Sequence, residues 1–381
     1  MNFDPTDTQQ LVRDMVRTFA EKEVTPQAAA IDRDDAFPRE LYRRLAALGL
    51  LGMTLPAEYG GSGADTVSWA IAEEELARAC PALADAQHVA KLMSDVILFN
   101  GTDEQRARYI PAIARGETIC VIAQTEPGTG SDVAGVQTLA RPTADGWVLN
   151  GTKRFITLAL VCDLAVVVAT TDPAKRHDGI ALFLVEASTP GFRHGAKDPV
   201  MGLRGLATGE IVLEDCHVPR SALLAPPGQG FKSAMRSLTG GRIGIGSQAV
   251  GIAQAAMEDA IGYARERAAF GQPIAGFQAI QFMLADMSAQ IEAARLLIRK
   301  AAWLRDQGRP FVREASEAKL IASETAIRVV HDALQIHGAA GYSSESRIER
   351  LYRDARLYPI WEGTSQIQRI IISRELLRGP R

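Results

Sequence analysis

The 381-residue chain has few cysteines, and they follow no pattern. None of the four lies in a Cys-x-x-Cys pair or at the spacing from histidine that zinc sites show. This excludes the common zinc motifs and a disulfide framework, so we expect no metal site and a reducing, cytoplasmic compartment. The N-terminus has no basic stretch followed by an apolar run, so we expect no secretory signal.

Long apolar runs and an excess of one charge are absent as well. The formal net charge is −3, with 47% hydrophobic and 23% charged residues. Nucleic-acid-binding proteins usually show a basic excess, so that class of partner is not expected. No apolar run approaches the roughly 20 residues of a membrane span. The balance is typical of a globular protein with two or three domains.

Several nucleotide-binding and hydrolase motifs are missing too. The chain has no Gly-x-Ser-x-Gly nucleophile motif and no Walker A motif. The glycine-rich stretches at residues 61–65 and 128–132 lack the strand–turn–helix context of a dinucleotide-binding fingerprint. A nicotinamide-dependent enzyme is therefore poorly supported.

What the sequence does contain is a change of pattern, from helical to β and back to helical. Residues 1–119 show apolar positions at helical spacing, and Thr6 with Gln9 resembles a capping box. Residues 120–229 hold short β-branched runs between turn residues. Residues 230–381 carry four long amphipathic stretches. We therefore predict an α+β fold with an N-terminal helical domain, a middle, mostly antiparallel β-domain and a C-terminal four-helix bundle.

Turn-forming residues predict two kinds of feature, hairpin turns and a glycine-rich loop. The dipeptides Asp145-Gly146 and Asn150-Gly151 are typical of tight hairpin turns. The loop at residues 125–133, Thr-Glu-Pro-Gly-Thr-Gly-Ser-Asp-Val, leaves backbone N–H groups free to face a phosphate, a flavin edge or another acceptor. Taken alone, such a loop is more often an ordinary turn at the end of a strand.

Charged and titratable residues near the predicted bundle allow two interpretations. Arg265 and Arg267 end a predicted helix just before Phe270. They are either cations favoured by the helix dipole or, in the case of Arg267, a phosphate clamp beside an aromatic ring. His331 and His337 lie at no metal-ligand spacing, so a structural role is the more common expectation for both.

Taken together, seven segments resemble the acyl-CoA dehydrogenases in order and spacing. These flavoproteins oxidise acyl-CoA thioesters to 2-enoyl-CoA in fatty acid metabolism, including β-oxidation. The segments are TEPGTGSDVAG, NGTKRFIT, VMGLRG, LTGGRIGIGSQAVGIAQ, RERAAFGQPIAGFQAIQFMLADM, QIHGAAGY and ERLYRDARLYPIWEGTSQIQR. They extend across essentially the whole chain. The family fold has the same α–β–α order and is usually a homotetramer, and its members pass electrons to electron-transfer flavoprotein.

The resemblance implies a site for FAD between the β-domain and the bundle, completed by a neighbouring subunit. The FAD-binding residues it implies are Thr125, Gly130, Ser131, Phe155, Ile156, Thr157, Arg267, Phe270, Gln278, Gln335, Gly338, Ala339, Thr364 and Gln366. Those from Arg267 to Ala339 match contacts made from the partner subunit. The substrate-binding residues it implies are Ser131, Thr239, Arg242 and Gly363.

By the same resemblance, Glu362 is the catalytic base. A carboxylate becomes more basic when water is removed and no cation replaces it, and Glu362 has no basic neighbour in its motif. Trp361 can exclude water, and Gly363 lets backbone approach the thioester. In the family the N–H of the glutamate and a ribityl hydroxyl of FAD bind the thioester oxygen. Glu362 then takes the α-proton while the β-hydrogen leaves as hydride to flavin N5. An isolated glutamate would more often be a loop-capping acid.

The chain departs from the family pattern at a few positions. Phe155 stands where tryptophan is usual, and Ala339 replaces a glycine. Thr239 stands where many relatives have an aspartate that meets the CoA pantetheine together with the arginine that is Arg242 here. Gly241 occupies the position where isovaleryl-type members carry their base, so we expect no second base.

These departures leave three alternatives open. The substrate is either a CoA thioester or an acyl group on a carrier protein, because Thr239 weakens the expected CoA contact. A flavin oxidase or monooxygenase uses the same fold, although the retained Glu362 motif argues against monooxygenases without the base. A helical scaffold that has lost FAD is the non-enzymatic alternative. The length and branching of the acyl group do not follow from the sequence.

Overall fold

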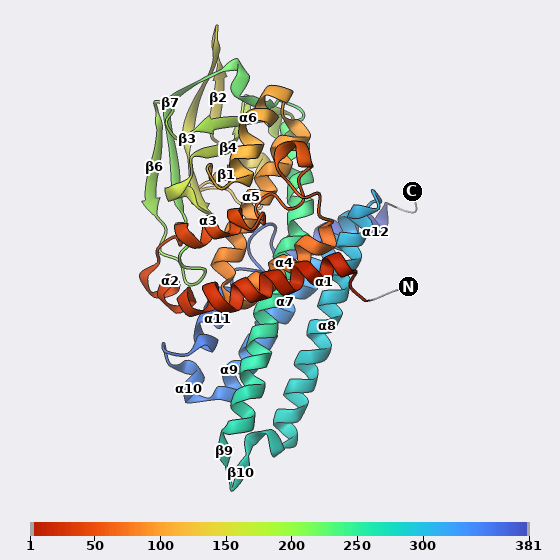
Figure 1. The fold of residues 1–381 in the computed structure, drawn as a ribbon. Helices are drawn as coiled ribbons and strands as arrows, with labels where there is room; N and C mark the ends of the chain where they lie inside the picture. The colour runs from red at the N-terminus through yellow and green to blue at the C-terminus, as the bar shows by residue number, and fades with distance from the viewer. Residues whose placement is uncertain (1–3, 379–381) are drawn as a thin grey trace.

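The first part of the chain is helical in the computed structural model, which describes residues 4–378 (Figure 1). Thr6 and Gln9 form the predicted capping box at the start of the first helix, which confirms that prediction. The helices are α1 (Asp7–Phe19), α2 (Ala28–Asp34), α3 (Arg39–Ala47), α4 (Thr66–Ala79), α5 (Pro81–Asn100) and α6 (Asp103–Ala114).

The middle of the chain forms one eight-stranded sheet. Its path is β6-β7-β3-β2-β4-β5-β8, with β1 paired to β4. Only β1–β4 and the short β2–β4 contact are parallel, so the prediction of a mostly antiparallel sheet is confirmed. The strands are β1 (Cys120–Ala123), β2 (Leu139–Pro142), β3 (Gly146–Ile156), β4 (Leu164–Thr170), β5 (Ile180–Glu186), β6 (Phe192–Lys197), β7 (Gly209–Pro219) and β8 (Leu223–Ala225).

One of the two predicted hairpin turns is wrong. Asp145-Gly146 does lie in the turn that joins β2 to β3. Asn150-Gly151 lies inside β3, where the register against β7 shifts between Leu149 and Gly151. A Cβ at Gly151 would lie 2.4 Å from Oγ1 of Thr138. The glycine therefore serves a β-bulge and a close backbone approach rather than a turn.

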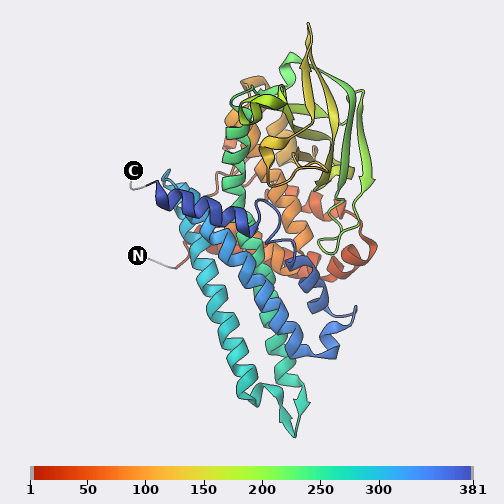
Figure 2. The same ribbon diagram turned by 180° about the vertical axis from the view of Figure 1, so that it is seen from behind.

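The last part of the chain is helical again and forms the predicted bundle. Three long helices pack on one another, a fourth helix of 13 residues packs on the third, and a short hairpin joins the first two at their far end. The elements are α7 (Gly230–Glu266), β9 (Ala268–Ala269), β10 (Gln272–Pro273), α8 (Gln278–Asp306), α9 (Val312–His337), α10 (Ala339–Tyr342), α11 (Arg347–Ala355) and α12 (Ser365–Leu377). Figure 1 and Figure 2 show the sheet at one end of the molecule and the β9–β10 hairpin at the other.

Helix α7 holds the three regions together because glycines let other helices approach its backbone. A Cβ at Gly244 would lie 2.5 Å from both the His88 and the Trp69 side chains, and one at Gly251 would lie 2.3 Å from the carbonyl oxygen of Glu74. Helices α4 and α5 therefore pack closely against α7. The expected helical, β and helical order is confirmed. Within the described residues, no helix has both the length and the apolar character needed to cross a membrane.

Candidate active site

Glu362 lies in the turn between α11 and α12, in a left-handed conformation with φ of 49°. A buried cation from α9 holds this turn. The Lys319 ammonium donates to the carbonyl oxygens of Tyr358, Trp361 and Gly363, at 2.6, 3.0 and 2.9 Å. Burial lowers the pKa of Lys319 to about 7. The turn is therefore fixed through its backbone, and the Glu362 side chain is left to face the helices.

The Glu362 carboxylate lies against helices α5 and α7. Its Oε1 is 3.1 Å from Nε2 of His88. Its Oε2 is buried and has no hydrogen-bond partner among residues 4–378. A Cβ at Gly241 would come within 2.5 Å of Oε2. The side chain is 15% exposed, so the acid is largely dry. The expectation of an acid without any basic neighbour was wrong, because His88 lies directly beside it.

His88 is held by an aromatic ring and surrounded by acids. Its ring stacks on Trp69 at 5.8 Å between centroids, with 19° between the planes. Although burial alone lowers the pKa of His88, the carboxylates of Glu362, Glu73 and Asp85 raise it to about 9. The imidazole therefore carries a proton at neutral pH and can donate to Glu362.

A chain of buried hydrogen bonds lies behind His88. Trp69 Nε1 donates to Glu73 at 3.1 Å, and Gln248 Nε2 donates to the other Glu73 oxygen at 2.7 Å. The Tyr358 hydroxyl donates to Gln248 at 2.9 Å. Burial raises the pKa of Glu73 to about 8. These bonds tie α4 and α7 to the segment that leads into the Glu362 turn.

The predicted substrate residues Thr239 and Arg242 lie together on α7, beside Gly241. Arg242 Nη1 is 3.4 Å from the hydroxyls of Thr239 and of Ser316 on α9, a long contact to each. Thr239 donates to the carbonyl oxygen of Met235 at 2.9 Å. Burial lowers the pKa of Arg242 to about 10. Within the described part of the chain no carboxylate is in hydrogen-bond contact with this buried guanidinium, so it is suited to a polar ligand group.

Buried hydrogen bonds hold the start of the glycine-rich loop after β1, and the glycines of the loop face open space. Glu126 is buried and accepts from Lys153 at 2.7 Å and from the Thr138 hydroxyl at 2.6 Å. Backbone hydrogen bonds between Glu126 and Thr129 close the loop. A Cβ at Gly128 or Gly130 would meet no atom within 4 Å. The loop can therefore bring its backbone close to a flat or anionic ligand, as a flavin site requires.

The end of β3 presents an open aromatic surface near this loop, since the Arg154 N–H donates to the Thr125 carbonyl oxygen at 2.9 Å. Phe155 is 57% exposed and has a φ of 56°. Its N–H donates to Asp198 at 3.0 Å, which holds this conformation. Ile156 is buried, and Thr157 is partly buried. A half-exposed phenyl ring on a fixed backbone fits the face of a flavin.

The other predicted FAD residues are divided between two places. Thr364 caps α12 and accepts from the Ile367 N–H at 3.2 Å, while Gln366 is exposed on the first turn of that helix. The remaining residues are exposed at the far end of the bundle, around the β9–β10 hairpin, and they are Arg267, Phe270, Gln278, Gln335, Gly338 and Ala339. One chain therefore does not bring them to its own Glu362 (Figures 1 and 2).

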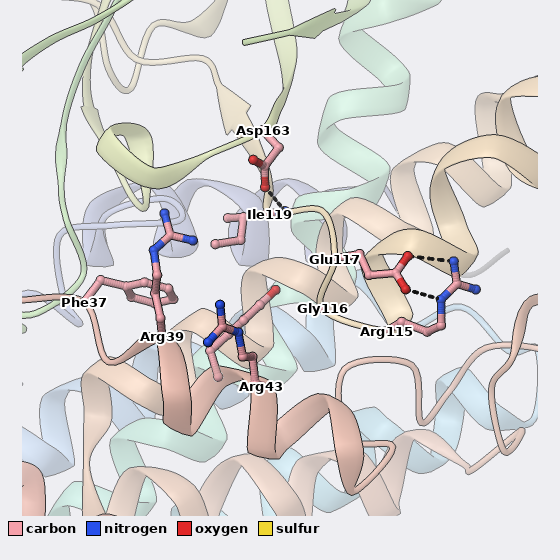
Figure 3. A pocket seen from close by; sticks show the side chains of 9 residues that line it. Phe37, Arg39, Arg43, Arg115, Gly116, Glu117, Ile119 and Asp163 are labelled. Carbon is pink, nitrogen blue, oxygen red and sulfur yellow. Dashed lines mark hydrogen bonds and ion pairs between the residues drawn. The ribbon is translucent and has the colours of Figure 1, made fainter. Parts of the chain in front are cut away.

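A separate hollow of about 340 Å³ lies between α3 and the segment before β1. Figure 3 shows two features of its wall, the Arg115–Glu117 ion pair and the bond from the Ile119 N–H to Asp163. None of the predicted site residues lines it. Its lining is Phe37, Arg39, Tyr42, Arg43, Arg115, Gly116, Glu117, Ile119 and Asp163. Within residues 4–378, no group of three or more His, Cys, Asp or Glu residues could hold a metal ion.

The motifs did not identify the residues that surround Glu362 from other helices. His88 and Asp85 lie on α5, which falls within the predicted helical domain of residues 1–119 but was not singled out as a helix, and Lys319 lies in the middle of α9. The composition of their segment is the signal that could have found His88 and Asp85. Residues 81–98 hold several ionisable side chains within a mostly apolar stretch, and buried charges are rare unless they are paired or functional.

Comparison with known proteins gives the same picture over the whole chain. Residues 6–117, 121–216 and 228–377 match the N-terminal, middle and C-terminal domains of acyl-CoA dehydrogenases. The human mitochondrial short-chain specific acyl-CoA dehydrogenase is 46% identical, over 98% of this chain and 91% of that protein.

Solved structures agree with the sequence matches. Butyryl-CoA dehydrogenase from Megasphaera elsdenii superimposes with a TM-score of 0.97 and 40% identity, over 99% of this chain and 100% of that one. A chain from a structure described as the electron transferring flavoprotein of Acidaminococcus fermentans has a TM-score of 0.97 and 41% identity, over the full length of both chains.

Proposed function

Because the chain belongs to the acyl-CoA dehydrogenase family, we propose that it oxidises an acyl-CoA thioester to the 2-enoyl-CoA with Glu362 as the base. The observation that carries the proposal is the placement of the Glu362 carboxylate. One oxygen is held by His88, and the other is dry, without a partner, and faces the bare backbone of Gly241. A free carboxylate oxygen in a dry site is what proton abstraction next to a thioester requires.

Members of this family bind FAD, and the residues present fit it. The open loop at residues 125–131 and the exposed Phe155 ring would hold it on this chain. We infer that a second copy supplies Arg267 and the other residues at the far end of the bundle, in a homotetramer. When bound, FAD supplies the centre that accepts the hydride.

The side chains of this protein prepare the proton transfer. Glu362 takes the α-proton on Oε2, and Trp361 beside it limits access of water. The Glu362 N–H has no hydrogen-bond partner among residues 4–378, so it is available to the thioester oxygen, where charge develops. Lys319 keeps that N–H in place because it binds the carbonyl oxygens on both sides of Glu362.

We further propose short acyl chains as substrates and electron-transfer flavoprotein as the electron acceptor. The first rests on the identity with a short-chain specific relative, and the second on the likeness to a chain from an electron transferring flavoprotein structure. A carrier-protein thioester is the second candidate, and turnover of CoA-bound and carrier-bound substrates decides between the two.

The test of the substrate class is a panel of short acyl thioesters, bound to CoA or to a carrier protein, with an artificial electron acceptor.

We expect Glu362→Gln to bind FAD normally and to lose at least about 10³-fold in kcat, since the amide cannot accept the proton. Turnover of Glu362→Gln close to that of wild type would contradict the assignment. A preparation that takes up no FAD would favour the scaffold alternative.

A further inference from the structure

We propose that His88 is a positioning residue for the base: it holds the Glu362 carboxylate toward α5, so that the other carboxylate oxygen is directed at the substrate. The inference rests on the proposed role of Glu362. It adds a residue from a different helix to the site.

The geometry gives His88 one orientation. Its side chain is 1% exposed, and Nε2 lies 3.1 Å from Oε1 of Glu362. The opposite nitrogen, Nδ1, is buried without a partner within the described residues and would touch a Cβ at Gly244. Trp69 stacks on one face of the ring. With no room to turn, the imidazole directs its one productive N–H at the base.

The choice of Oε1 matters for catalysis. A hydrogen bond to Oε1 restrains the rotation of the carboxylate, and Oε2 is left facing Gly241 without any partner among residues 4–378. The two oxygens therefore have separate tasks, one for anchoring and the other for reaction. A carboxylate that is fixed before substrate arrives loses less freedom in the transition state.

Titratable groups from each neighbouring element face His88 or its partner acid. His88 faces Glu362 from the turn before α12, Glu73 from α4 and Asp85 from α5. Helix α7 contributes Gly244 to this contact and, near Glu362, Arg242. Lys319 from α9 also lies near Glu362. Glu362 is the acid that raises the pKa of His88 most, so the imidazole keeps its proton through neutral pH.

The consequence for turnover separates positioning from packing. If the hydrogen bond to Oε1 positions the carboxylate, kcat depends on a donor at residue 88. A variant that keeps a side-chain donor there then keeps more turnover than a variant that fills the same space without one. A purely structural role for His88 would lower kcat equally in both variants.

The first experiment compares kcat of the FAD-loaded enzyme with a saturating acyl-CoA and an artificial acceptor. His88→Gln keeps a hydrogen-bond donor but loses the charge, and His88→Leu loses both. We expect kcat to fall at least about tenfold in His88→Leu and clearly less in His88→Gln, which can still donate to Oε1. His331→Gln, at an exposed histidine on α9, should turn over like wild type. Equal kcat in the two His88 variants overturns the proposal.

The second experiment needs no substitution at His88 and no turnover. Deuterium exchange at the imidazole C2 position, followed by mass spectrometry, gives a titration midpoint for each histidine. We expect the His88 midpoint to fall by at least about one pH unit in Glu362→Gln, because the acid that raises it is gone. His331 is the internal control in both proteins. An unchanged His88 midpoint overturns the proposal.

The outcomes separate this inference from the proposed function. If Glu362→Gln is inactive, the two His88 variants have equal kcat and the His88 midpoint does not move, the base assignment stands and the role of His88 falls. If Glu362→Gln turns over like wild type, the proposed function falls, although the exchange experiment still reports whether the two side chains interact.

Discussion

At the scale of single residues, the reactive side of Glu362 depends on a position without a side chain. A Cβ at Gly241 would lie 2.5 Å from Oε2, which is too close for both atoms to stay in place. Oε2 is also the oxygen that has no partner among the described residues. Gly241 therefore leaves the room that the carboxylate itself needs in this position.

We expect Gly241→Ala to displace the carboxylate and to lower kcat at least about tenfold. The helix itself should tolerate the change, since alanine has the higher helix propensity. Steady-state turnover, with FAD content and Tm of the same preparation, checks this. Gly262→Ala is the matched control on α7, because a Cβ there meets no atom within 4 Å. Equal kcat for Gly241→Ala and wild type would contradict this account of Gly241.

Glu73 makes the stability of the fold depend on pH in a predictable direction. Burial raises its pKa to about 8, whereas an unfolded glutamate titrates near about 4.3. Between these values the folded protein keeps a proton that the unfolded chain has lost. The free energy of unfolding contributed by Glu73 therefore falls as the pH rises through this window.

Glu73→Gln removes this titration, so we expect a smaller decline of the free energy of unfolding between about pH 5 and pH 8. The difference from wild type should exceed about 1 kcal/mol. Urea unfolding at several pH values measures it. Glu58→Gln, at an exposed glutamate, should leave the slope unchanged. A wild-type slope in Glu73→Gln would show that Glu73 is ionised in the folded protein.

At the scale of helices, α5 buries charge along one face. Asp85, His88, Lys91 and Asp95 are all buried and recur at spacings of three and four residues, so they share that face. Lys91 binds Asp95 and lies 4.9 Å from the centre of the Trp69 ring. Asp95 also accepts from Arg305 of α8 at 2.6 Å. The helix is therefore fixed between α4 and α8 by ion pairs as well as by apolar packing.

Asp95→Asn leaves Lys91 and Arg305 without their shared counter-charge in a largely dry place. We expect it to lower the free energy of unfolding by about 3 kcal/mol, as measured by denaturant titration near pH 7. The control is Asp14→Asn, because Asp14 is exposed on α1 and its contact with Gln10 faces solvent. If both variants lost the same small amount, the ion pairs would not be important for the fold.

The sequence predicts elements well where local chemistry decides them. The Thr6 capping box and the Asp145-Gly146 turn need only neighbouring residues, and both are present. Asn150-Gly151 was misread because the contact with Thr138, distant in sequence, decides its conformation. Helix α5 was not singled out because residues 81–97 are buried on every side, so the helix lacks the alternation of apolar and polar faces that marks the other helices.

The same reasoning applies to the candidate site. Glu362, Thr239 and Arg242 were identified by their motifs, and the structure places them around Gly241. Their catalytic and binding roles stay predictions. His88 could not be found this way, because it meets Glu362 across 274 positions of sequence. No local pattern encodes that contact.

At the scale of the whole molecule, the predicted FAD residues lie at two ends. The loop after β1 and Phe155 belong to the β-domain, while Arg267 and Phe270 lie at the tip of the bundle (Figure 1). Phe270 is 96% exposed. This arrangement supports our proposal that a second copy completes each site.

We expect Arg267→Ala to lower FAD retention, because a phosphate-binding cation is lost. After extended dialysis, the flavin absorbance per chain should fall severalfold below that of wild type. Arg265→Ala is the matched control two residues away, at another exposed arginine in the last turn of α7. Unchanged flavin content in Arg267→Ala would count against the clamp and against the shared site.

The length of α7 links these observations. The helix has 37 residues, which corresponds to a rod of about 55 Å, with Gly241 in its first half and Arg267 just beyond its end. In the proposed assembly each rod serves two catalytic centres, its own through the glycine and a neighbour's through the arginine. The smallest active unit is then a pair of chains, so dilution that separates the chains would abolish activity.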